Sequence, residues 1–523
     1  MPVLRLLIPL TVAALLLPGA VARSAPAAPT ANLWVAPGGS SHCARSSVPL
    51  PYSRAGAKNA LCDTADRAYH AAAVGDVVRV KNGRYPGFVF TADHAKKRGT
   101  VVIEPETDFG VTLTSRTSLG AGVGYLTLRR FLVAAPAGGF INNPHGMSRD
   151  VTIDGNRINV GKRVDGRPAG ILFYTNIDGY RIVNNVIGPT CCGSANQSSP
   201  VAITIGKAND SAPNADHVLI DGNTIQYALR NASYWPTGSY GPAPDVSCLV
   251  ATCHMDAIQI WGIQNSTISN NVIDHAEVQG IFIEDAAGAV NKNLNIVNNS
   301  IRVVGGDAAM NLKGVSGHWN IAFNSTPDVL ITGYGFPAAA RGTTVAFEAN
   351  EGELLVANTT GNNGGCQGGN PSVKLVYSYN TWRRGAGGTT PTAACSTTDR
   401  LRARAYTGLG ARLQAFYARR LHKGAATPVG GAAYYVVDRI RKHRVLAFHL
   451  ELHVSPAFSV ANHFDLLTRD ALPGDAVVRT HQSRCVVWQS RELRRLTRGL
   501  DYAVATARRG RKMFLRAEAK PRC

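Results

Sequence analysis

The sequence predicts a mainly β protein, built as a solenoid of short parallel strands and followed by a small α+β domain. Three observations support this prediction: a recurring four-residue phrase, a second series of alternating apolar strands, and a change of composition near residue 400. The phrase is apolar-x-x-Asn, first seen at Ile153 to Asn156. Each occurrence would mark one coil, because repeats of this kind stack one upon another along a solenoid.

We assign the repeat to eight occurrences of the phrase, whose successive asparagines lie 22 to 48 residues apart. An Asn at the same turn of each coil can stack on its neighbours and bond backbone groups that a bent strand leaves unpaired. The shortest intervals suit a coil of three short strands, and the longer ones indicate inserted loops. The asparagines are Asn156, Asn185, Asn223, Asn271, Asn299, Asn324, Asn358 and Asn380.

The first residues have the pattern of a secretory signal peptide. Arg5 precedes an apolar run, and the small-x-small sequence Ala20-Val21-Ala22 would allow cleavage after Ala22. No later apolar stretch is long enough to span a bilayer. We therefore expect signal peptide 1–22 and a secreted, extracellular protein with no membrane insertion.

Residues 32–90 predict an N-terminal cap. The stretch "LWVAPGG" reads as a first strand and turn, and "GDVVRVKNGRYPG" as strand, turn and strand. Between them, Asp63 to Ala73 predicts an amphipathic helix with Asp63 as its N-cap. Such a helix would cover the backbone edge that a solenoid exposes at its end.

Ten cysteines in an exported chain favour disulfides. We expect Cys43 to pair with Cys62 in the cap, Cys366 with Cys395 in the last coil, and Cys485 with Cys523 in the C-terminal domain. Three connectivities remain open for Cys191, Cys192, Cys248 and Cys253, although cross-links between adjacent loops are favoured over metal binding.

A second strand in each coil alternates inward and outward residues. The residues expected to point inward are Ile203, Ile205, Ile258, Ile260, Ile281, Ile283, Met310 and Leu312. Two outward rows follow, which we name the Gln259 row and the Trp261 row. The Gln259 row contains Leu172, Thr204, Gln259, Phe282 and Asn311. The Trp261 row contains Tyr174, Gly206, Trp261, Glu284 and Lys313. Because neighbouring strands lie about 4.8 Å apart, Trp261, Glu284 and Lys313 should be adjacent on one face.

Beyond a Gly/Thr/Pro/Ala-rich linker at 385–399, the repeat stops, and residues 401–523 predict a separate α+β domain. The expected elements are helices at Leu409–Arg420 and Arg491–Thr497 and paired strands at Ala432–Ile440 and Val445–His453. Residues 400–523 hold 25 of the 55 basic residues and most of the net charge of +21. For an exported monomer we expect an anionic polysaccharide as partner rather than nucleic acid, although a basic surface without a specific partner is an alternative.

Residues 32–397 resemble a right-handed parallel β-helix of the pectate lyase-like superfamily. The cap sequence, the coils "VTIDGN", "VLIDGN", "TISNNVI" and "LNIVNNSI", and the strand "HMDAIQIWG" carry this resemblance. It implies the fold and a carbohydrate-active class that includes polysaccharide lyases, hydrolases, uronate epimerases and binding proteins. The sequence lacks the paired-Asp and Gly-His pattern of polygalacturonases and the Arg-x-Pro-x-x-Arg-like motif of the best-known pectate lyases, so the resemblance does not define the reaction.

The most site-like stretch is His254-x-Asp256-x-x-Gln259-x-Trp261, which follows a long aromatic insertion containing Trp235. A Trp ring can stack on a sugar, and Gln or Asp can bond its hydroxyls, so Trp261, Gln259, Tyr174 and Trp235 are candidate substrate-binding residues. The alternative is structural, with Asp256 capping a turn, His254 in a loop and Trp261 covering the sheet.

Glu284 and Lys313 are candidate catalytic residues on the same predicted face. In a lyase, Lys313 would remove the proton α to a uronate carboxylate, while Gln259 and Asn311 neutralise that carboxylate. In a hydrolase, Glu284 and Asp256 would form the carboxylate pair. The simplest alternative is a solvated cross-strand ion pair between Glu284 and Lys313.

The favoured function is a lyase that cleaves an acidic polysaccharide by β-elimination, with catalytic candidates Lys313, Glu284, His254 and Asp256. A paired-carboxylate hydrolase and a non-catalytic glycan-binding surface protein are the alternatives. No cofactor or metal site is expected. Glu284 and Asp285 could contribute to a calcium site, but no third acidic residue is close in sequence.

Overall fold

The structure is a computed structural model of the 523-residue chain. The residues it describes run from 28 to 402, with gaps at 136–137, 160, 163–168, 192–200, 230–255, 287–288, 304–307, 323, 333–341, 349, 356–372, 379–380, 384–394 and 397–399. Six C-terminal strands are also described, at 431–441, 444–454, 479–481, 485–488, 502–509 and 512–518.

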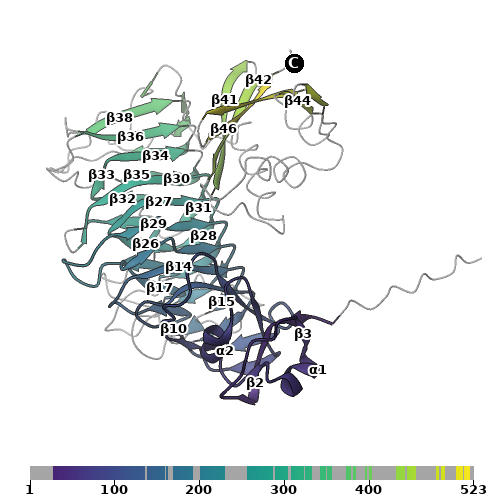
Figure 1. Ribbon diagram of the computed structural model, residues 1–523. Helices are drawn as coiled ribbons and strands as arrows, with labels where there is room; N and C mark the ends of the chain where they lie inside the picture. Colours follow the sequence, from purple (N-terminus) through teal and green to yellow (C-terminus); the bar gives the residue numbers. More distant parts are fainter. Residues whose placement is uncertain are drawn as a thin grey trace, which may run out of the picture.

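The chain winds as a right-handed parallel β-helix, and Figure 1 shows its coils stacked from the N-terminal cap upward. Strands in successive coils pair in parallel, so each coil adds one strand to each of three faces. Face 1 precedes the repeated Asn, face 2 follows it directly, and face 3 carries the two outward rows. The predicted fold class is confirmed.

The strands of each face pair in chain order. Face 1 consists of β2 Leu33–Ser40, β5 Val77–Val80, β8 Val101–Pro105, β11 Gly124–Arg129, β14 Ser148–Asp154, β19 Arg181–Val183, β24 Leu219–Asp221, β27 Ile263–Ser269, β30 Asn291–Val297, β34 His318–Ala322, β36 Thr343–Glu348 and β38 Val373–Ser378. Face 2 consists of β6 Gly83–Tyr85, β9 Val111–Leu113, β12 Leu132–Ala134, β15 Arg157–Asn159, β20 Val186–Ile187, β25 Thr224–Leu229, β28 Val272–Ala276 and β31 Ser300–Val303. Face 3 consists of β7 Val89–Phe90, β10 Thr117–Leu119, β13 Phe140–Asn142, β17 Ile171–Tyr174, β22 Ile203–Gly206, β26 Ile258–Trp261, β29 Gln279–Glu284 and β32 Ala308–Leu312.

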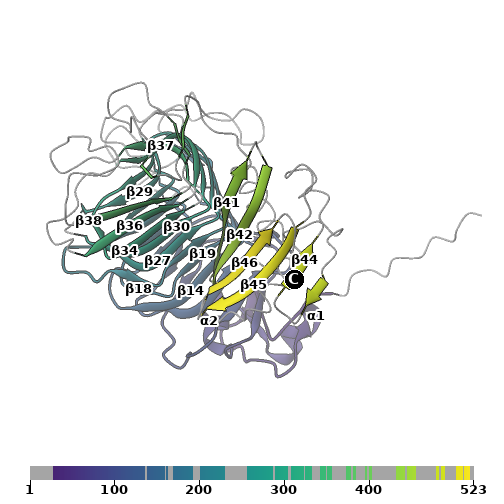
Figure 2. The same ribbon diagram turned by 90° about the horizontal axis from the view of Figure 1, so that it is seen from above.

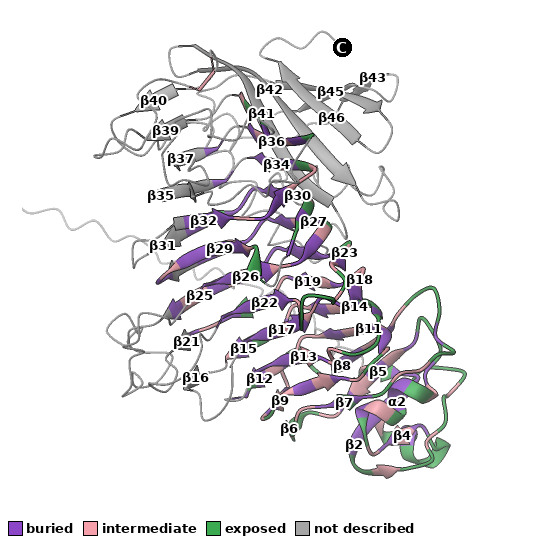
Figure 3. Cartoon of the chain, turned by 90° about the vertical axis from the view of Figure 1, so that its left-hand side faces the viewer, coloured by how far each residue is buried: buried purple, intermediate pink, exposed green. Residues whose placement is uncertain are grey.

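The core runs along the inside of the coils. Apolar side chains from the three faces meet there. Figure 3 shows the buried residues distributed along the stacked strands. The residues predicted to point inward from face 3 are all buried, and Ile203, Ile258, Ile281 and Met310 form one continuous register. Burial of these β-branched side chains on a pleated surface is the main reason that the repeat adopts this fold.

A continuous ladder of side-chain amides confirms the role proposed for the repeated Asn. Asn271, for example, donates from its Nδ2 to the Oδ1 of Asn299 at 2.9 Å and to the carbonyl of Ile220 at 3.0 Å. Its own Oδ1 accepts from the backbone N and the Nδ2 of Asn223, both at 3.0 Å. Every member of the ladder is buried: Asn156, Asn185, Asn223, Asn271, Asn299, Asn324 and Asn350.

The seventh ladder position was wrongly predicted. Asn324 donates to the Oδ1 of Asn350 at 3.1 Å, so Asn350 occupies the position that the repeat assigned to Asn358. Strand β36 then pairs with β38 so that Phe347 lies opposite Tyr377. Asn358 and Asn380 themselves lie outside the described residues. The prediction failed because Phe347-x-x-Asn350 matches the apolar-x-x-Asn phrase as well as Leu355-x-x-Asn358 does, so the phrase alone does not distinguish the two.

The residue before several ladder asparagines adopts a left-handed backbone conformation. Its φ is +61° at Gly155, +57° at Asn184, +67° at Gly222, +56° at Asn270 and +56° at Asn298. Gly and Asn tolerate this conformation better than other residues, since Gly lacks a Cβ and Asn bonds locally. The backbone geometry therefore explains why the repeat reads Gly-Asn or Asn-Asn.

The N-terminal cap contains the predicted strand, helix and strand pair, together with short helix α1 Tyr52–Ala55. Helix α2 spans Ala65–Ala71, and its N-cap is Thr64, whose side chain accepts from the backbone N of Arg67 at 3.2 Å. The prediction of Asp63 as N-cap was wrong, because the Asp63 carboxylate pairs with the Arg67 side chain instead. The predicted Cys43–Cys62 disulfide is present.

The solenoid continues through β37 Glu351–Leu355, β39 Thr381–Arg383 and β40 Arg400–Arg402, which pair in parallel. Cys395 is disulfide-bonded, while Cys366 and Cys523 lie outside the described residues.

Six antiparallel strands form the described C-terminal sheet, and β41 lies beside β30 of face 1 (Figure 2). They are β41 Gly431–Arg441, β42 Arg444–Val454, β43 Arg479–His481, β44 Cys485–Trp488, β45 Tyr502–Arg509 and β46 Lys512–Glu518. The predicted strand pair is thus confirmed, whereas both predicted helices lie outside the described residues.

Candidate functional site

Face 3 brings together the residues that the sequence placed in the two rows. Tyr174, Gly206, Trp261 and Glu284 lie opposite one another on four successive strands. Lys313 follows directly, since its backbone N donates to the carbonyl of Ile283 at 2.8 Å. The Gln259 row runs beside it in the predicted order, from Leu172 to Asn311.

The polar centre of this face lies between the two rows. The Nε2 of Gln259 donates to the Oε2 of Glu284 at 3.1 Å, which joins the rows diagonally. The Nζ of Lys313 lies 5.0 Å from the centroid of the Phe282 ring. Phe282 occupies the Gln259 row but is only 2% exposed, so the lysine covers it. An amide, a carboxylate and an ammonium group are therefore grouped over about two strand spacings.

Trp261 leans away from this centre. Its Nε1 donates to the carbonyl of Lys207 at 3.3 Å, and its six-membered ring lies over Gly206 on the preceding coil. The half-buried ring therefore extends the row toward Tyr174 rather than toward Glu284. This arrangement leaves an aromatic surface on one side of the polar centre.

Asn291 fixes the backbone of two members of the Trp261 row and of Gly262, which directly follows Trp261. Its Oδ1 accepts from the backbone N of Gly262 at 2.9 Å, and its Nδ2 donates to the carbonyls of Glu284 at 2.8 Å and Lys313 at 3.0 Å. The side chain is fully buried. One amide thus joins three successive coils where face 3 turns into face 1, a role that the sequence repeat did not reveal.

Tyr174 and Asn311 lie at opposite ends of the candidate face. The backbone N of Tyr174 donates to the Oδ1 of Asn142 at 2.6 Å. Asn311 is 7% exposed, and its Oδ1 has no hydrogen-bond partner among the described residues. Asn311 follows Phe282 in the Gln259 row and lies two residues before Lys313, at the end of the polar centre that the lysine occupies.

Asp256 does not lie beside Glu284. Glu284 pairs with Trp261, which is five residues along the strand from Asp256. At about 3.3 Å per residue, the two carboxyl positions are separated by roughly 16 Å. Asp256 is fully buried at the corner between faces 2 and 3, one strand from Gln279. His254 and Trp235 lie outside the described residues.

A second polar cluster lies on face 1. Asp221 is fully buried, and its Oδ1 accepts from the Oγ of Ser269 and the Nδ2 of Asn270, both at 2.6 Å. Burial raises the pKa of the Asp221 carboxyl to about 6, while these hydrogen bonds and Arg181 oppose the shift. Burial likewise lowers the pKa of the Arg181 guanidinium. The cluster joins adjacent coils, and the repeat gave no signal for its ionisable character.

Within the described part of the chain, no group of three or more His, Cys, Asp or Glu side chains is arranged to hold a metal ion. Glu284 is half-buried and Asp285 is exposed at the end of β29. The same described residues include no helix both long and apolar enough to cross a bilayer.

No protein-family model matches this sequence, and no curated protein matches it. Several solved structures are similar to this chain at low identity. An alginate lyase from Paenibacillus sp. str. FPU-7 is 14% identical, with a TM-score of 0.36 over 60% of this chain and 95% of that one. PfbA, a surface adhesin of Streptococcus pneumoniae, is 13% identical, with a TM-score of 0.35 over 59% and 78%. The A-module of the Azotobacter vinelandii mannuronan C-5 epimerase AlgE4 is 10% identical, with a TM-score of 0.28 over 63% and 94%.

Proposed function

We propose that this protein is an extracellular polysaccharide lyase that cleaves an acidic glycan by β-elimination on face 3. The observation that carries the proposal is the grouping of Gln259, Glu284 and Lys313 on adjacent strands. The Cys43–Cys62 disulfide supports an oxidising compartment.

In the proposed reaction, the Nζ of Lys313 acts as general base on a uronate residue. It takes the proton from C5, next to the carboxylate. The electron pair of that C–H bond forms the C4–C5 double bond, and the C4–O4 bond breaks. The leaving oxygen takes a proton from water, which completes the cleavage without an oxidant or cofactor.

The surrounding groups suit the charge that develops in this reaction. Removal of the C5 proton moves negative charge onto the uronate carboxylate, so amide donors beside it stabilise the transition state. Gln259 and Asn311 supply amide groups on either side of Phe282. Glu284 holds the Gln259 amide in place through its 3.1 Å hydrogen bond, so we assign Glu284 a positioning role.

The paired-carboxylate hydrolase is less well supported. Hydrolases of that type hold their carboxyl groups about 5 to 9.5 Å apart. The strand register separates Asp256 from Glu284 by roughly 16 Å, so these two residues do not form such a pair.

A non-catalytic glycan-binding protein is the second candidate, because Trp261 presents a half-buried aromatic ring beside the polar centre. Aromatic rings contribute to sugar binding whether or not a reaction follows. In this case Lys313 would contribute only to retention of an anionic polymer.

The deciding experiment incubates the secreted chain with a panel of polyuronates and follows the ultraviolet absorbance of the unsaturated product. We expect Lys313→Ala to lose turnover by roughly 100-fold or more, since general-base catalysis contributes about 10²–10⁴-fold. Glu284→Gln should retain more activity. Lys292→Ala is the matched control, because Lys292 is an exposed lysine on face 1.

Absence of unsaturated product from every polyuronate would reject the lyase proposal. If Trp261→Ala then abolished retention on a glycan while Lys313→Ala did not, the binding function would be supported. Equal loss of activity in Lys292→Ala and Lys313→Ala would remove the specific role given to Lys313.

A further inference from the structure

We propose that a pocket at the N-terminal end of the solenoid binds a neutral saccharide unit, separately from the site on face 3. The pocket has a volume of about 550 Å³, within the range of small-molecule sites. It lies between strand β2, the first turn of helix α2 and the connection from β6 to β7. The residues that decide its chemistry are Val35, Asp63, Arg67, Tyr85, Phe88 and Val89.

One wall of the pocket is apolar and rigid. Phe88 is 8% exposed and contacts Tyr85 edge-to-face, with ring centroids 6.3 Å apart. Phe131 packs behind Phe88 at 5.7 Å, so the ring cannot move inward. Val89 is 64% exposed at the edge of this wall. An exposed apolar rim above a fixed aromatic wall can contact the apolar face of a sugar ring.

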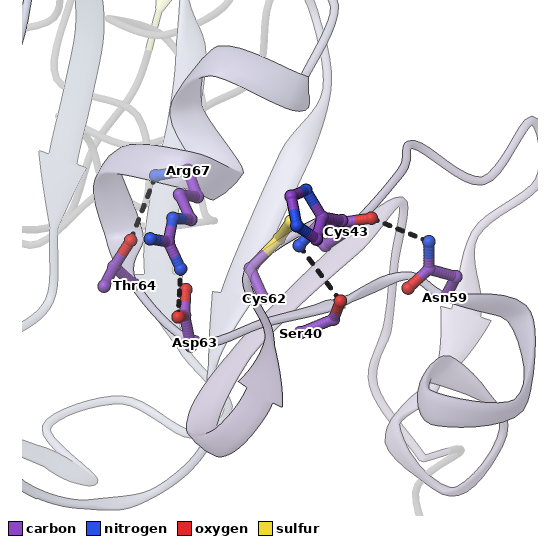
Figure 4. Close-up of a disulfide and its surroundings, with 8 residues drawn as sticks. Ser40, Cys43, Asn59, Cys62, Asp63, Thr64 and Arg67 are labelled. Atoms are coloured by element: carbon purple, nitrogen blue, oxygen red, sulfur yellow. Dashed lines mark hydrogen bonds and ion pairs between the residues drawn. A yellow bond between two sulfur atoms is a disulfide. The ribbon is translucent and has the colours of Figure 1, made fainter.

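The opposite wall is polar. Asp63 pairs with the Arg67 side chain through one carboxylate oxygen, as Figure 4 shows. The other oxygen, Oδ1, is buried and has no hydrogen-bond partner among the described residues. A ligand hydroxyl can reach the pair through the Asp63 Oδ2 and the Arg67 guanidinium, whose side chains are 30% and 45% exposed.

The Asp63–Arg67 pair is not needed to begin helix α2. Thr64 already caps the helix, and Asp66 accepts from the backbone N of Thr91 at 2.7 Å. The Cys43–Cys62 disulfide fixes the chain immediately before Asp63 (Figure 4). The pair is therefore held in place by neighbouring residues, while its two partly exposed side chains line the pocket.

The charge of the pocket favours a neutral ligand. Two carboxylates, Asp63 and Asp66, line the pocket against one guanidinium group, that of Arg67. A uronate would bring a further negative charge to this wall, which electrostatic repulsion opposes. The preferred ligand thus has hydroxyl groups on one side, an apolar face on the other and no carboxylate. This preference differs from that proposed for face 3.

The pocket also continues the candidate face. Val89 is the first member of the Gln259 row, since it pairs with Ser118, which pairs with Ile141, which in turn pairs with Leu172. Five strand spacings, or about 24 Å, separate Val89 from Gln259. A saccharide in the pocket would therefore lie at the N-terminal end of the surface on which we place the acidic polymer.

The test uses the full secreted chain and isothermal titration with maltotriose, cellotriose and mannotriose, with trigalacturonate as the acidic comparison. We expect at least one neutral trisaccharide to bind. Val89→Trp should fill the pocket and weaken that binding roughly tenfold or more. Val48→Trp is the matched control, because Val48 is 59% exposed and does not line the pocket, so its affinity should stay within about twofold.

Asp63→Asn provides a milder variant of nearly the same shape. We expect it to weaken neutral saccharide binding roughly fivefold or more through loss of the charged acceptor, with an unchanged thermal midpoint. Lys313→Ala should bind the neutral trisaccharide as the parent does, which keeps this test independent of the lyase proposal.

Four results would overturn the pocket proposal. The first is that no neutral trisaccharide binds, and the second is that one binds equally well to Val89→Trp and to the parent. The third is that trigalacturonate binds more tightly than the neutral sugars at a site sensitive to Val89→Trp. The fourth is that Lys313→Ala loses binding of the neutral trisaccharide. The last result would place the sugar on face 3 instead.

Discussion

The six-membered ring of Trp261 occupies the space that a side chain at Gly206 would fill. A Cβ at position 206 would lie 2.1 to 2.4 Å from three atoms of the ring. Carbon atoms do not approach this closely without strong repulsion, so only glycine allows the ring to lie against the preceding strand. The orientation of the aromatic surface on face 3 therefore depends on a missing side chain one coil away.

Gly206→Ala should displace the Trp261 ring. Because φ at Gly206 is not in the left-handed region, the backbone tolerates alanine and the effect is steric. We expect a change in the near-ultraviolet circular dichroism and a destabilisation of about 1–3 kcal/mol, as for other overpacked sites. Gly56→Ala is the control, since nothing lies within 4 Å of its added Cβ and its φ is −60°. An unchanged aromatic spectrum in Gly206→Ala would contradict the described contact.

Removal of one ladder amide should destabilise the whole solenoid. Asn271→Ala deprives the Asn223 amides of their acceptor and the Ile220 carbonyl of its donor, all in a buried environment. Unsatisfied buried groups cost about 1–3 kcal/mol each, so we expect a loss of at least about 3 kcal/mol in the free energy of unfolding. Thermal and denaturant unfolding of the full chain measure it.

The control for the ladder is Asn320→Ala. Asn320 is half-buried on face 1 and is not a member of the ladder. Its replacement should change the stability by less than about 0.5 kcal/mol, as is usual for surface positions. Comparable losses in Asn271→Ala and Asn320→Ala would show that the ladder has no special contribution.

Asp221 should make stability depend on pH. Its pKa is about 6 in the folded state against an ordinary 3.8, because burial disfavours the charged form. The folded state then binds the proton more tightly than the unfolded state, so stability falls as pH rises from about 4 to about 6. Asp221→Asn removes this dependence and should stabilise the protein at neutral pH by about 1–3 kcal/mol. Urea unfolding across this range measures both effects.

The exposed residue Asp285 provides the comparison for this experiment, and Asp285→Asn should keep the parent's pH dependence. If Asp221→Asn kept the same slope as the parent, the buried carboxyl would not be its source. Asparagine retains one side-chain oxygen for the bonds from Ser269 and Asn270, which limits the loss of contacts.

Loss of the Cys43–Cys62 disulfide should destabilise the N-terminal cap. The two residues are separated by 19 positions, and closing a loop of this length contributes about 3 kcal/mol. The double variant Cys43→Ser/Cys62→Ser should therefore unfold at a lower temperature. Ser41→Ala, at an exposed position of the same segment, should unfold with the parent. Equal midpoints for the three proteins would contradict a stabilising role for this disulfide.

Periodicity alone was sufficient to predict most of face 3. The alternation in β26 and β29 assigned both the buried Ile258 and Ile281 and the outward Trp261 and Glu284, because a strand has only two sides. The wrong prediction of Asn358 as a ladder member arises because the four-residue phrase is not specific enough. The same phrase also occurs at Phe347 to Asn350, and the hydrogen bond from Asn324 identifies Asn350 as the ladder member.

Other features depend on contacts between distant segments and could not be predicted from the sequence. Asn291 joins Gly262, Glu284 and Lys313 through a turn whose geometry the repeat does not encode. The separation of Asp256 from Glu284 likewise follows from strand register. Sequence spacing therefore predicted the two rows of face 3 but not the contacts that a turn or a bend in the chain creates.

The amide ladder joins each coil to the next with the same hydrogen bonds, whatever the number of residues in the coil. Successive ladder residues are separated by 25 to 48 positions, yet their amide contacts stay between 2.9 and 3.1 Å. A foreign peptide inserted between Asn223 and Asn271 would therefore leave the stacked framework intact, provided that both asparagines return to their positions. The chain could serve as a rigid rod for displaying engineered loops at set heights along one side.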